Sequence, residues 1–297
     1  RNKRIKEMKR IYFTGIFALA TLFLGCEKDY LDRAPEDRVD AEFFFNTAKD
    51  LEVATNDFYT MLPTTGVYND DDASDNIVPL IAADRIRGGR IVPTKRGSGG
   101  WSWGRLRDIN YFLENYQKVD DEAAKAKYGG IAKFFRAYFY FEKVARFGDV
   151  PWYGEVLEAG DEALYDPRDP RELVMDSIMA DIDFAIENIP AEVQLNRVTK
   201  YTALLLKARI ALFEGTFRKY HGIAGHEEFL QEAVSASEAL MNSGAYSLYT
   251  VGGPDAAYRN LFGRNDQDAT ETILARDFDT ELGQHNLGYL MTSPTAG

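Results

Sequence analysis

The sequence predicts a mainly α-helical protein built of antiparallel helix pairs with irregular loop insertions. Three observations favour this class: apolar residues recur at helical spacing in successive segments, Gly and Pro separate those segments, and only one short stretch has a strand pattern. Consecutive helices of about 16 to 20 residues joined by short loops are typical of solenoid-like helix hairpins, although no fixed-period repeat is visible.

The first predicted helix covers residues 46–62, where apolar positions alternate with acids. Residues 63–100 look irregular and include the acidic stretch NDDDASDN and the glycine-rich KRGSGG. A loop of this length inside a folded body is usually functional or mobile. Helical spacing returns over residues 101–119, which carry a broad apolar face.

The most apolar predicted helix lies within residues 131–151. Its apolar side chains follow the i, i+3, i+4, i+7 spacing of one helix face and extend beyond it, so we expect burial on most sides. Gly148 can adopt the left-handed conformation that ends a helix, and Pro151 prevents continuation.

The next predicted helix begins with clear capping signals. Asp169 is a candidate N-cap, Pro170 suits the first helical position, and Glu172 completes a capping box. We expect this helix to stop at Pro190, because proline cannot continue the hydrogen-bonding pattern.

Two more helices and one strand are predicted to follow. Thr199 can cap a helix dense in Leu and Ala, and another helix covers about residues 227–243 and ends at Gly244. The stretch ETILARDF, residues 271–278, is the best strand candidate.

Residues 1–25 have the pattern of a signal peptide. Residues 1–10 are basic, and residues 11–24 are uncharged and largely apolar. That run is too short for a membrane-spanning helix, which needs about 20 apolar residues, but it matches a signal-peptide core. Residues 26–40 are then expected to form a polar tether, and residues 41–297 the helical domain.

Cys26 is the only cysteine of the chain, so it cannot form an internal disulfide. The stretch LFLGC that ends in it resembles a bacterial lipobox, in which the cysteine becomes the lipidated first residue of the mature protein. The resemblance implies a lipid anchor at Cys26, and each buried methylene of such an anchor contributes about 0.8 kcal/mol. An unmodified cysteine is the alternative.

The charge of the chain argues against nucleic acid as a partner. The 297 residues carry a formal net charge of -12, whereas phosphate backbones are bound by basic surfaces. The sequence also contains no P-loop, Rossmann or nucleophile-elbow motif, so no cofactor is expected.

Five stretches, in order along the chain, resemble the SusD/RagB family of surface glycan-binding lipoproteins. They are WSWGRLRDINYFLENY, FFRAYFYFEKVARFGDVPW, NRVTKYTALLLKARIALFEG, MNSGAYSLY and ETILARDF. Ile131 stands where the family often has an acid, a departure that bears on local helix packing. Family members are usually much longer, so we expect this chain to be the N-terminal part of a longer protein, truncated at its C-terminus.

The resemblance implies a helical body of four tetratricopeptide-like helix pairs with irregular insertions on one face. It also implies capture of an oligosaccharide outside the cell and its delivery to a SusC-like TonB-dependent transporter, without bond chemistry. The protein is accordingly expected to be a lipid-anchored, outward-facing protein of the outer membrane and not an enzyme.

Trp101 and Trp103 are the first candidates for ligand contact. They stand at a loop-to-helix junction beside glycines, and tryptophan offers a sugar ring a large apolar face at little entropic cost. The alternative is that one or both pack into the core beneath the next helix. We expect only one of the two to be exposed, because alternate residues of an extended segment face opposite ways.

The loop before the tryptophans supplies weaker candidates. Arg85, Arg87 and Arg90 are positioned to bind sugar hydroxyls or carboxylates, and a solvated loop is the alternative. Asn110 is expected to bond to backbone. The acidic residues 69–76 suit calcium in composition but lack the glycine and distal Glu of an EF-hand, so a plain acidic loop is preferred and no metal site is predicted.

Two rival functions stay open at this stage. A glycoside hydrolase would need two carboxylates about 5 to 9 Å apart, and the 47 acids of the chain do not exclude such a pair. A helix-hairpin scaffold that binds a peptide or a protein is equally compatible with the fold. The five family-like stretches favour a nutrient-binding lipoprotein over both.

Overall fold

The computed structural model describes residues 44–63, 87–89, 91–95, 97–264, 266–278 and 281. The chain divides into two units, residues 1–44 and residues 45–297, and the fold described below belongs to the second. Several predicted features lie outside the described residues: the signal peptide, Cys26, the tether, the acidic residues 69–76, Arg85 and Arg90.

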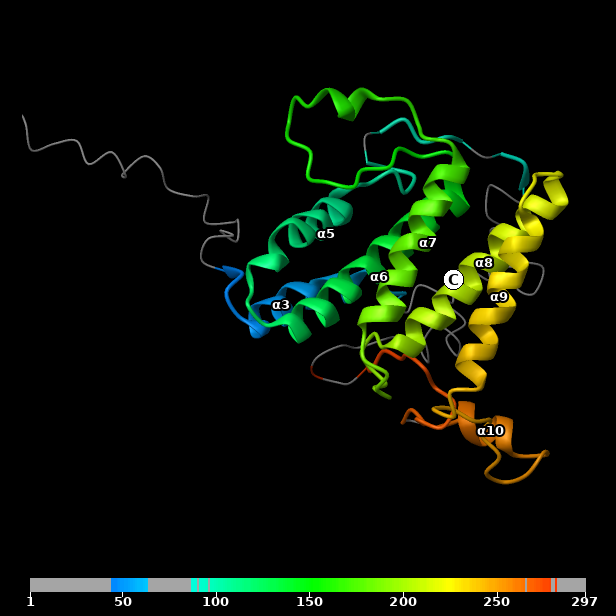
Figure 1. Cartoon of the computed structure of the whole chain (residues 1–297). Coiled ribbons are helices and arrows are strands. Elements are labelled where there is room, and N and C mark those ends of the chain that lie inside the picture. Colours follow the sequence, from blue (N-terminus) through cyan, green and yellow to red (C-terminus); the bar gives the residue numbers. More distant parts are fainter. Residues whose placement is uncertain are drawn as a thin grey trace, which may run out of the picture. The chain divides into compact units, whose positions relative to one another are not determined.

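The described part of the chain is helical, and Figure 1 shows α5 to α9 side by side, each packed against the next. The α-helices are α3 (Ala48–Asn56), α5 (Gly104–Asn115), α6 (Glu122–Phe147), α7 (Arg171–Asn188), α8 (Lys200–His221), α9 (His226–Met241) and α10 (Ala257–Phe262). Short 3-10 helices are η2 (Asp57–Met61), η4 (Tyr116–Lys118) and η5 (Glu162–Tyr165). The pairs α6/α7 and α8/α9 confirm the predicted class of helix hairpins.

Helix α6 forms the centre of the core, as its apolar sequence predicts. Phe135, Ala137 and Tyr140 are fully covered, because α3, α5 and α7 all pack against this helix. The ring of Phe135 meets the ring of Phe58 edge to face, with centroids 6.0 Å apart. Such aromatic pairs add about 0.5 to 1.5 kcal/mol beyond the apolar area that they bury.

Two glycines inside α6 let its neighbours approach closely. A Cβ atom placed on Gly129 would lie 2.6 Å from Cε2 of Tyr116, and one placed on Gly130 would lie 2.7 Å from Cγ1 of Ile189. Both positions therefore lack room for a side chain. They directly precede Ile131, where the sequence predicted a local change in helix packing.

Three predicted helix ends are close to those observed. Gly148, with φ 72°, ends α6, and Thr199 caps α8 in a reciprocal box with Thr202. Helix α9 ends at Met241, shortly before the predicted Gly244. Helix α6, in contrast, begins at Glu122, well before the predicted residues 131–151.

The predicted cap of α7 is wrong. Asp169 pairs with Val150 in an isolated antiparallel bridge, and its carboxylate accepts the N–H of Trp152 at 2.7 Å instead of capping the helix. The first N–H of α7, that of Arg171, instead donates to Oδ1 of Asp149, just after α6, at 3.1 Å. The GDVPW stretch is therefore a structural junction between α6 and α7.

The strand predicted over residues 271–278 is not formed. These residues adopt turns, bends and irregular backbone. The N–H of Ala275 donates to the carbonyl of Leu195 at 2.7 Å, but no second strand is present within the described residues to complete a ladder.

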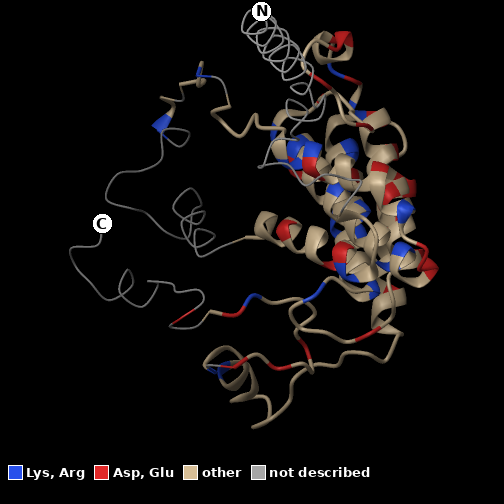
Figure 2. Cartoon of the chain, turned by 90° about the vertical axis from the view of Figure 1, so that its left-hand side faces the viewer, with Lys and Arg blue, Asp and Glu red and all other residues tan. Residues whose placement is uncertain are grey.

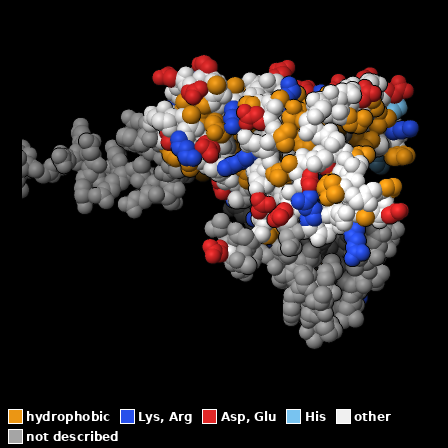
Figure 3. Space-filling view, turned by 90° about the horizontal axis from the view of Figure 1, so that it is seen from below, with side chains coloured by type: hydrophobic (Ala, Val, Ile, Leu, Met, Phe, Trp, Pro, Cys, Tyr) orange, Lys and Arg blue, Asp and Glu red, His pale blue; other side chains and the backbone are white. Residues whose placement is uncertain are grey.

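The described surface is mixed in character. Basic and acidic positions are interspersed along the helices (Figure 2), and apolar side chains lie among charged ones on the face shown in Figure 3. None of the helices described is both long and apolar enough to cross a bilayer.

Candidate functional site

A cleft of about 700 Å³ opens between the start of α5 and the long α6–α7 connection. This volume lies within the range of about 300 to 1,000 Å³ that is typical of ligand pockets. We call it the tryptophan cleft. Its lining residues are Trp101, Trp103, Gly104, Leu106, Arg107, Asn110, Pro151, Tyr153, Glu155, Leu157, Glu158, Ala159, Leu164, Asp166, Pro167 and Arg168.

Trp101 and Trp103 form one wall together. Their ring centroids are 5.1 Å apart in an edge-to-face arrangement, and both side chains are half-buried. The expectation that only one would be exposed is wrong, because residues two apart in an extended segment lie on the same side. Packing also covers part of Trp103, because its ring meets the rings of Phe139 and Tyr153 edge to face, with centroids 5.7 Å and 5.6 Å apart.

The backbone before the tryptophans is held by α6. Gly100 has φ +84°, which favours glycine, and its carbonyl accepts a hydrogen bond from Nζ of Lys143 at 2.5 Å. A Cβ atom on Gly100 would lie 3.1 Å from the guanidinium of Arg146. Burial, together with the nearby Arg146, lowers the pKa of Lys143.

Hydrogen bonds from α5 and α6 hold the adjoining wall, residues 152–158, whose Tyr153 ring contacts Trp103. Nδ2 of Asn110 donates to the carbonyls of Tyr153 and Glu155, both at 2.9 Å, which confirms that Asn110 bonds to backbone. The hydroxyl of Tyr140 accepts the N–H of Tyr153 at 2.6 Å. Side-chain groups thus replace the hydrogen bonds that this irregular segment lacks.

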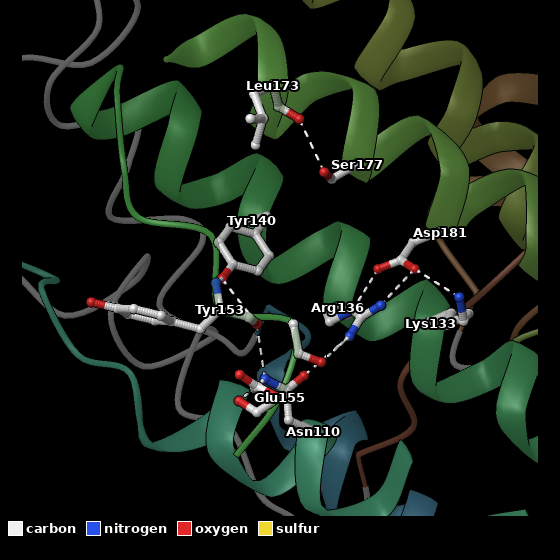
Figure 4. A network of polar contacts seen from close by, with 10 residues as sticks. Asn110, Lys133, Arg136, Tyr140, Tyr153, Glu155, Leu173, Ser177 and Asp181 are labelled. Carbon is white, nitrogen blue, oxygen red and sulfur yellow. Dashed lines mark hydrogen bonds and ion pairs between the residues drawn. The ribbon is translucent and has the colours of Figure 1, made fainter. Parts of the chain in front are cut away.

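Arg136 links this wall to the helix pair behind it, as Figure 4 shows. Its Nη1 donates to Oδ1 of Asn110 and to the carbonyl of Gly154, both at 3.2 Å. Its other nitrogens bind Asp181 on α7, and Nζ of Lys133 lies 3.2 Å from the same carboxylate. The buried cation is thereby paired and hydrogen-bonded, as burial of a charge requires.

Charged and polar groups line the rest of the tryptophan cleft. Arg107 pairs with Glu158 at 3.0 Å, and the guanidinium of Arg168 lies 4.8 Å from the ring centroid of Trp101. Burial, with a contribution from nearby Asp166, raises the pKa of Tyr153, so its hydroxyl is protonated and available as a donor at neutral pH. The cleft therefore offers apolar rings flanked by hydrogen-bonding groups.

The structure brings together only part of the predicted site. Trp101 and Trp103 line the cleft, whereas Arg87 is exposed and is not among its lining residues. Sequence reasoning missed Tyr153, Arg107 and Arg168, which no motif marks as ligand-facing. Across the described ranges, no three His, Cys, Asp or Glu side chains gather as a metal site.

Comparisons with known proteins give a consistent result, although no protein-family model matches the chain. The chain is 26% identical over 241 residues to SusD-like protein P2 of Formosa agariphila, covering 71% of this chain and 45% of the relative. It is 22% identical over 301 residues to SusD-like protein P25 of the same organism, covering 93% and 53%. A solved SusD-like protein of Bacteroides fragilis superposes with a TM-score of 0.68 at 23% identity, covering 84% and 48%. The chain thus resembles SusD-like proteins in sequence and in fold.

The chain spans about half the length of the SusD-like relatives that it matches. The names of two further solved structures mention a glycan. One, solved with a xylogluco-oligosaccharide, has a TM-score of 0.57 at 21% identity and covers 77% of this chain and 46% of that one. The other is a laminarin-binding SusD-like protein with a TM-score of 0.50 at 19% identity, covering 67% and 44%.

Proposed function

We propose that this chain is the glycan-capturing part of a surface lipoprotein that delivers oligosaccharide to a SusC-like transporter. The tryptophan cleft is the observation that carries the proposal. Trp101 and Trp103 share one wall of a cleft large enough for several sugar rings, and aromatic rings pack well against the apolar face of a pyranose. The protonated Tyr153, whose ring contacts Trp103, supplies a hydrogen-bond donor.

Related proteins support the ligand class. One SusD-like neighbour is named for laminarin binding, and another structure contains a xylogluco-oligosaccharide. Laminarin and xyloglucan are therefore the first glycans to test. The proposed role is capture without bond cleavage.

Polysaccharide affinity gels test the proposal directly. Migration of the protein should be retarded by at least one glycan of a panel containing laminarin and xyloglucan. Trp101→Ala and Trp103→Ala should each reduce the retardation, since stacking on one aromatic ring contributes about 1 to 3 kcal/mol, by analogy with base stacking. Tyr220→Ala is the matched control, because Tyr220 is 82% exposed on α8 and does not line the cleft.

Each negative result in these gels has a definite meaning. Retardation that survives both tryptophan substitutions would place the glycan elsewhere, and retardation by no glycan would contradict capture. Incubated oligosaccharides should remain intact, and any cleavage that disappears in carboxylate variants would instead identify a hydrolase.

The anchor and the transporter partner rest on the sequence. LFLGC resembles a lipobox, so a palmitate analogue should label the protein in cells and Cys26→Ser should abolish the label. The SusD-like relationship supports a barrel transporter as partner, which should co-purify from mild detergent. Retained label in Cys26→Ser, or repeated isolation of the protein alone, would contradict the respective part of the proposal.

A further inference from the structure

A second and smaller cleft lies between α3, the start of α6 and the α7–α8 loop. Its volume is about 280 Å³. No residue lines both clefts. Lys127 of this cleft lies roughly 24 Å along α6 from Lys143, which binds the carbonyl of Gly100 next to Trp101. We call it the α3–α6 cleft. Its lining residues are Glu52, Thr55, Tyr59, Lys127, Tyr128, Ile131, Gln194, Arg197 and Val198.

Hydrogen-bond donors predominate in the α3–α6 cleft. The hydroxyl of Tyr59 accepts the N–H of Val198 at 2.9 Å, which leaves its own hydrogen to be donated. Burial raises the pKa of Tyr59 and of Tyr128, so both phenols are protonated at neutral pH. The cleft therefore presents two hydroxyl donors to any ligand that carries acceptors.

Lys127 and Tyr128 are half-buried donors. Among the described residues, neither the Nζ of Lys127 nor the hydroxyl of Tyr128 makes a hydrogen bond or ion pair, and Nζ lies 5.6 Å from the Tyr128 ring centroid. A partly covered donor gains from an added acceptor, because desolvation has already weakened its interaction with water. Both groups line the cleft.

The local charge favours an anion with additional hydroxyl groups. Arg197 lies 4.0 Å from Glu52 and 5.5 Å from the ring centroid of Tyr59, while the other carboxylate oxygen of Glu52 is bound by Lys49 at 2.9 Å. Arg197 also donates to Oδ1 of Asn56 from Nη1, and Lys127 acts on Glu52 only through its charge. The cleft thus holds two cations, Lys127 and Arg197, and one carboxylate that Lys49 already pairs. Glu52 remains an acceptor for a ligand hydroxyl.

We infer that the α3–α6 cleft binds a small hydroxy carboxylate of monosaccharide size, such as a uronic acid. The carboxylate fits between Lys127 and Arg197, and the hydroxyls match Glu52, Tyr128 and the amide of Gln194. A volume of about 280 Å³ lies just below the range of about 300 to 1,000 Å³ for drug-sized ligands and suits a single ring. This site does not depend on glycan capture in the tryptophan cleft.

Titration calorimetry with glucuronate and glucose tests the site, because the two sugars differ in the carboxylate that the inference requires. Glucuronate should bind the purified protein at least about tenfold more tightly than glucose, since a charged hydrogen bond contributes about 1.5 to 3 kcal/mol. Added salt should weaken the binding because both cations are partly exposed. Equal binding of the two sugars, or no binding of glucuronate, would overturn the inference.

Variants then locate the binding. Lys127→Met should weaken glucuronate binding about tenfold, and Tyr128→Phe, which keeps the ring and the fold, should weaken it severalfold. Lys219→Met is the matched control, because Lys219 is exposed on α8 and outside the cleft. Binding that is unchanged in Lys127→Met, that is lost in Trp103→Ala, or that inorganic phosphate displaces with equal affinity would each overturn the assignment.

Discussion

Arg136 of α6 and Asp181 of α7 form a two-point ion pair, with Nε–Oδ2 at 2.6 Å and Nη2–Oδ1 at 2.8 Å. Both side chains are buried. Because the same guanidinium also binds Asn110 and the carbonyl of Gly154, one cation joins the helix pair to the wall of the tryptophan cleft. Stability and ligand binding should therefore respond together when this pair is disturbed.

Arg136→Met should destabilise the protein by about 3 kcal/mol. Removing one partner of a buried ion pair costs about 3 to 5 kcal/mol, and Lys133, still 3.2 Å from Asp181, keeps the loss at the lower end. Urea denaturation measures the change. Arg105→Ala is the control, since Arg105 pairs with Asp57 in solvent and should cost less than about 1 kcal/mol. Similar losses in the two variants would contradict this account.

Gly129→Ala and Gly130→Ala should each destabilise the protein, although alanine favours helices by about 1 kcal/mol over glycine. The added methyl groups would lie 2.6 Å from Tyr116 and 2.7 Å from Ile189, and overpacking costs about 1 to 3 kcal/mol. Thermal melts measure the effect. Gly104→Ala, which has no atom within 4 Å of the new Cβ, should be neutral or stabilising. A stabilising Gly129→Ala would show that α6 is more loosely packed than described.

Asp149→Ala should loosen the first turn of α7. Its carboxylate accepts the N–H of Arg171 at 3.1 Å, and losing such a cap costs about 1 kcal/mol. Hydrogen exchange should accelerate at Arg171 and in the turn that follows it. Asp169→Ala should instead affect the amide of Trp152. If exchange at Arg171 became faster in Asp169→Ala but not in Asp149→Ala, Asp169 would be the cap of α7, as the sequence predicted.

Arg168→Ala should strengthen the binding of a neutral glycan about twofold to fivefold. The guanidinium lies 4.8 Å from the ring centroid of Trp101, and an exposed cation–π contact contributes about 0.5 to 1 kcal/mol that a sugar on this ring face must displace. Affinity gels with laminarin measure the change. Weaker binding in the variant would mean that Arg168 contacts the glycan directly.

Local signals explain what the sequence predicted well. Gly148 and Thr199 end and begin helices through conformations and hydrogen bonds that involve only nearby residues. Trp101 and Trp103 do line one cleft, and their position beside glycines at a helix start is visible in the sequence; their contact with a ligand stays a prediction. The error about their relative exposure came from applying strand alternation to residues two apart.

Tertiary contacts explain what the sequence did not predict. Asp149 caps α7 only because the bridge between Val150 and Asp169 brings the end of α6 to the start of α7. Tyr153 and Arg168 face the tryptophans because the α6–α7 connection folds over α5. Neither arrangement produces a periodic or short-range pattern in the sequence, so neither can be predicted from sequence patterns.

The bridge between Val150 and Asp169 also joins the two ends of the α6–α7 connection, where the helices stop and the loop that lines the cleft begins. The connection between them is closed at its base, so its length does not alter the spacing of α6 and α7. Doubling the length of a flexible loop costs only about 0.6 kcal/mol, and surface loops tolerate insertions. Residues 153–155 are bonded to α5 and α6, whereas the outer part of the connection, residues 159–165, can be exchanged or lengthened. That outer part is the natural place to graft a new specificity onto this helical frame.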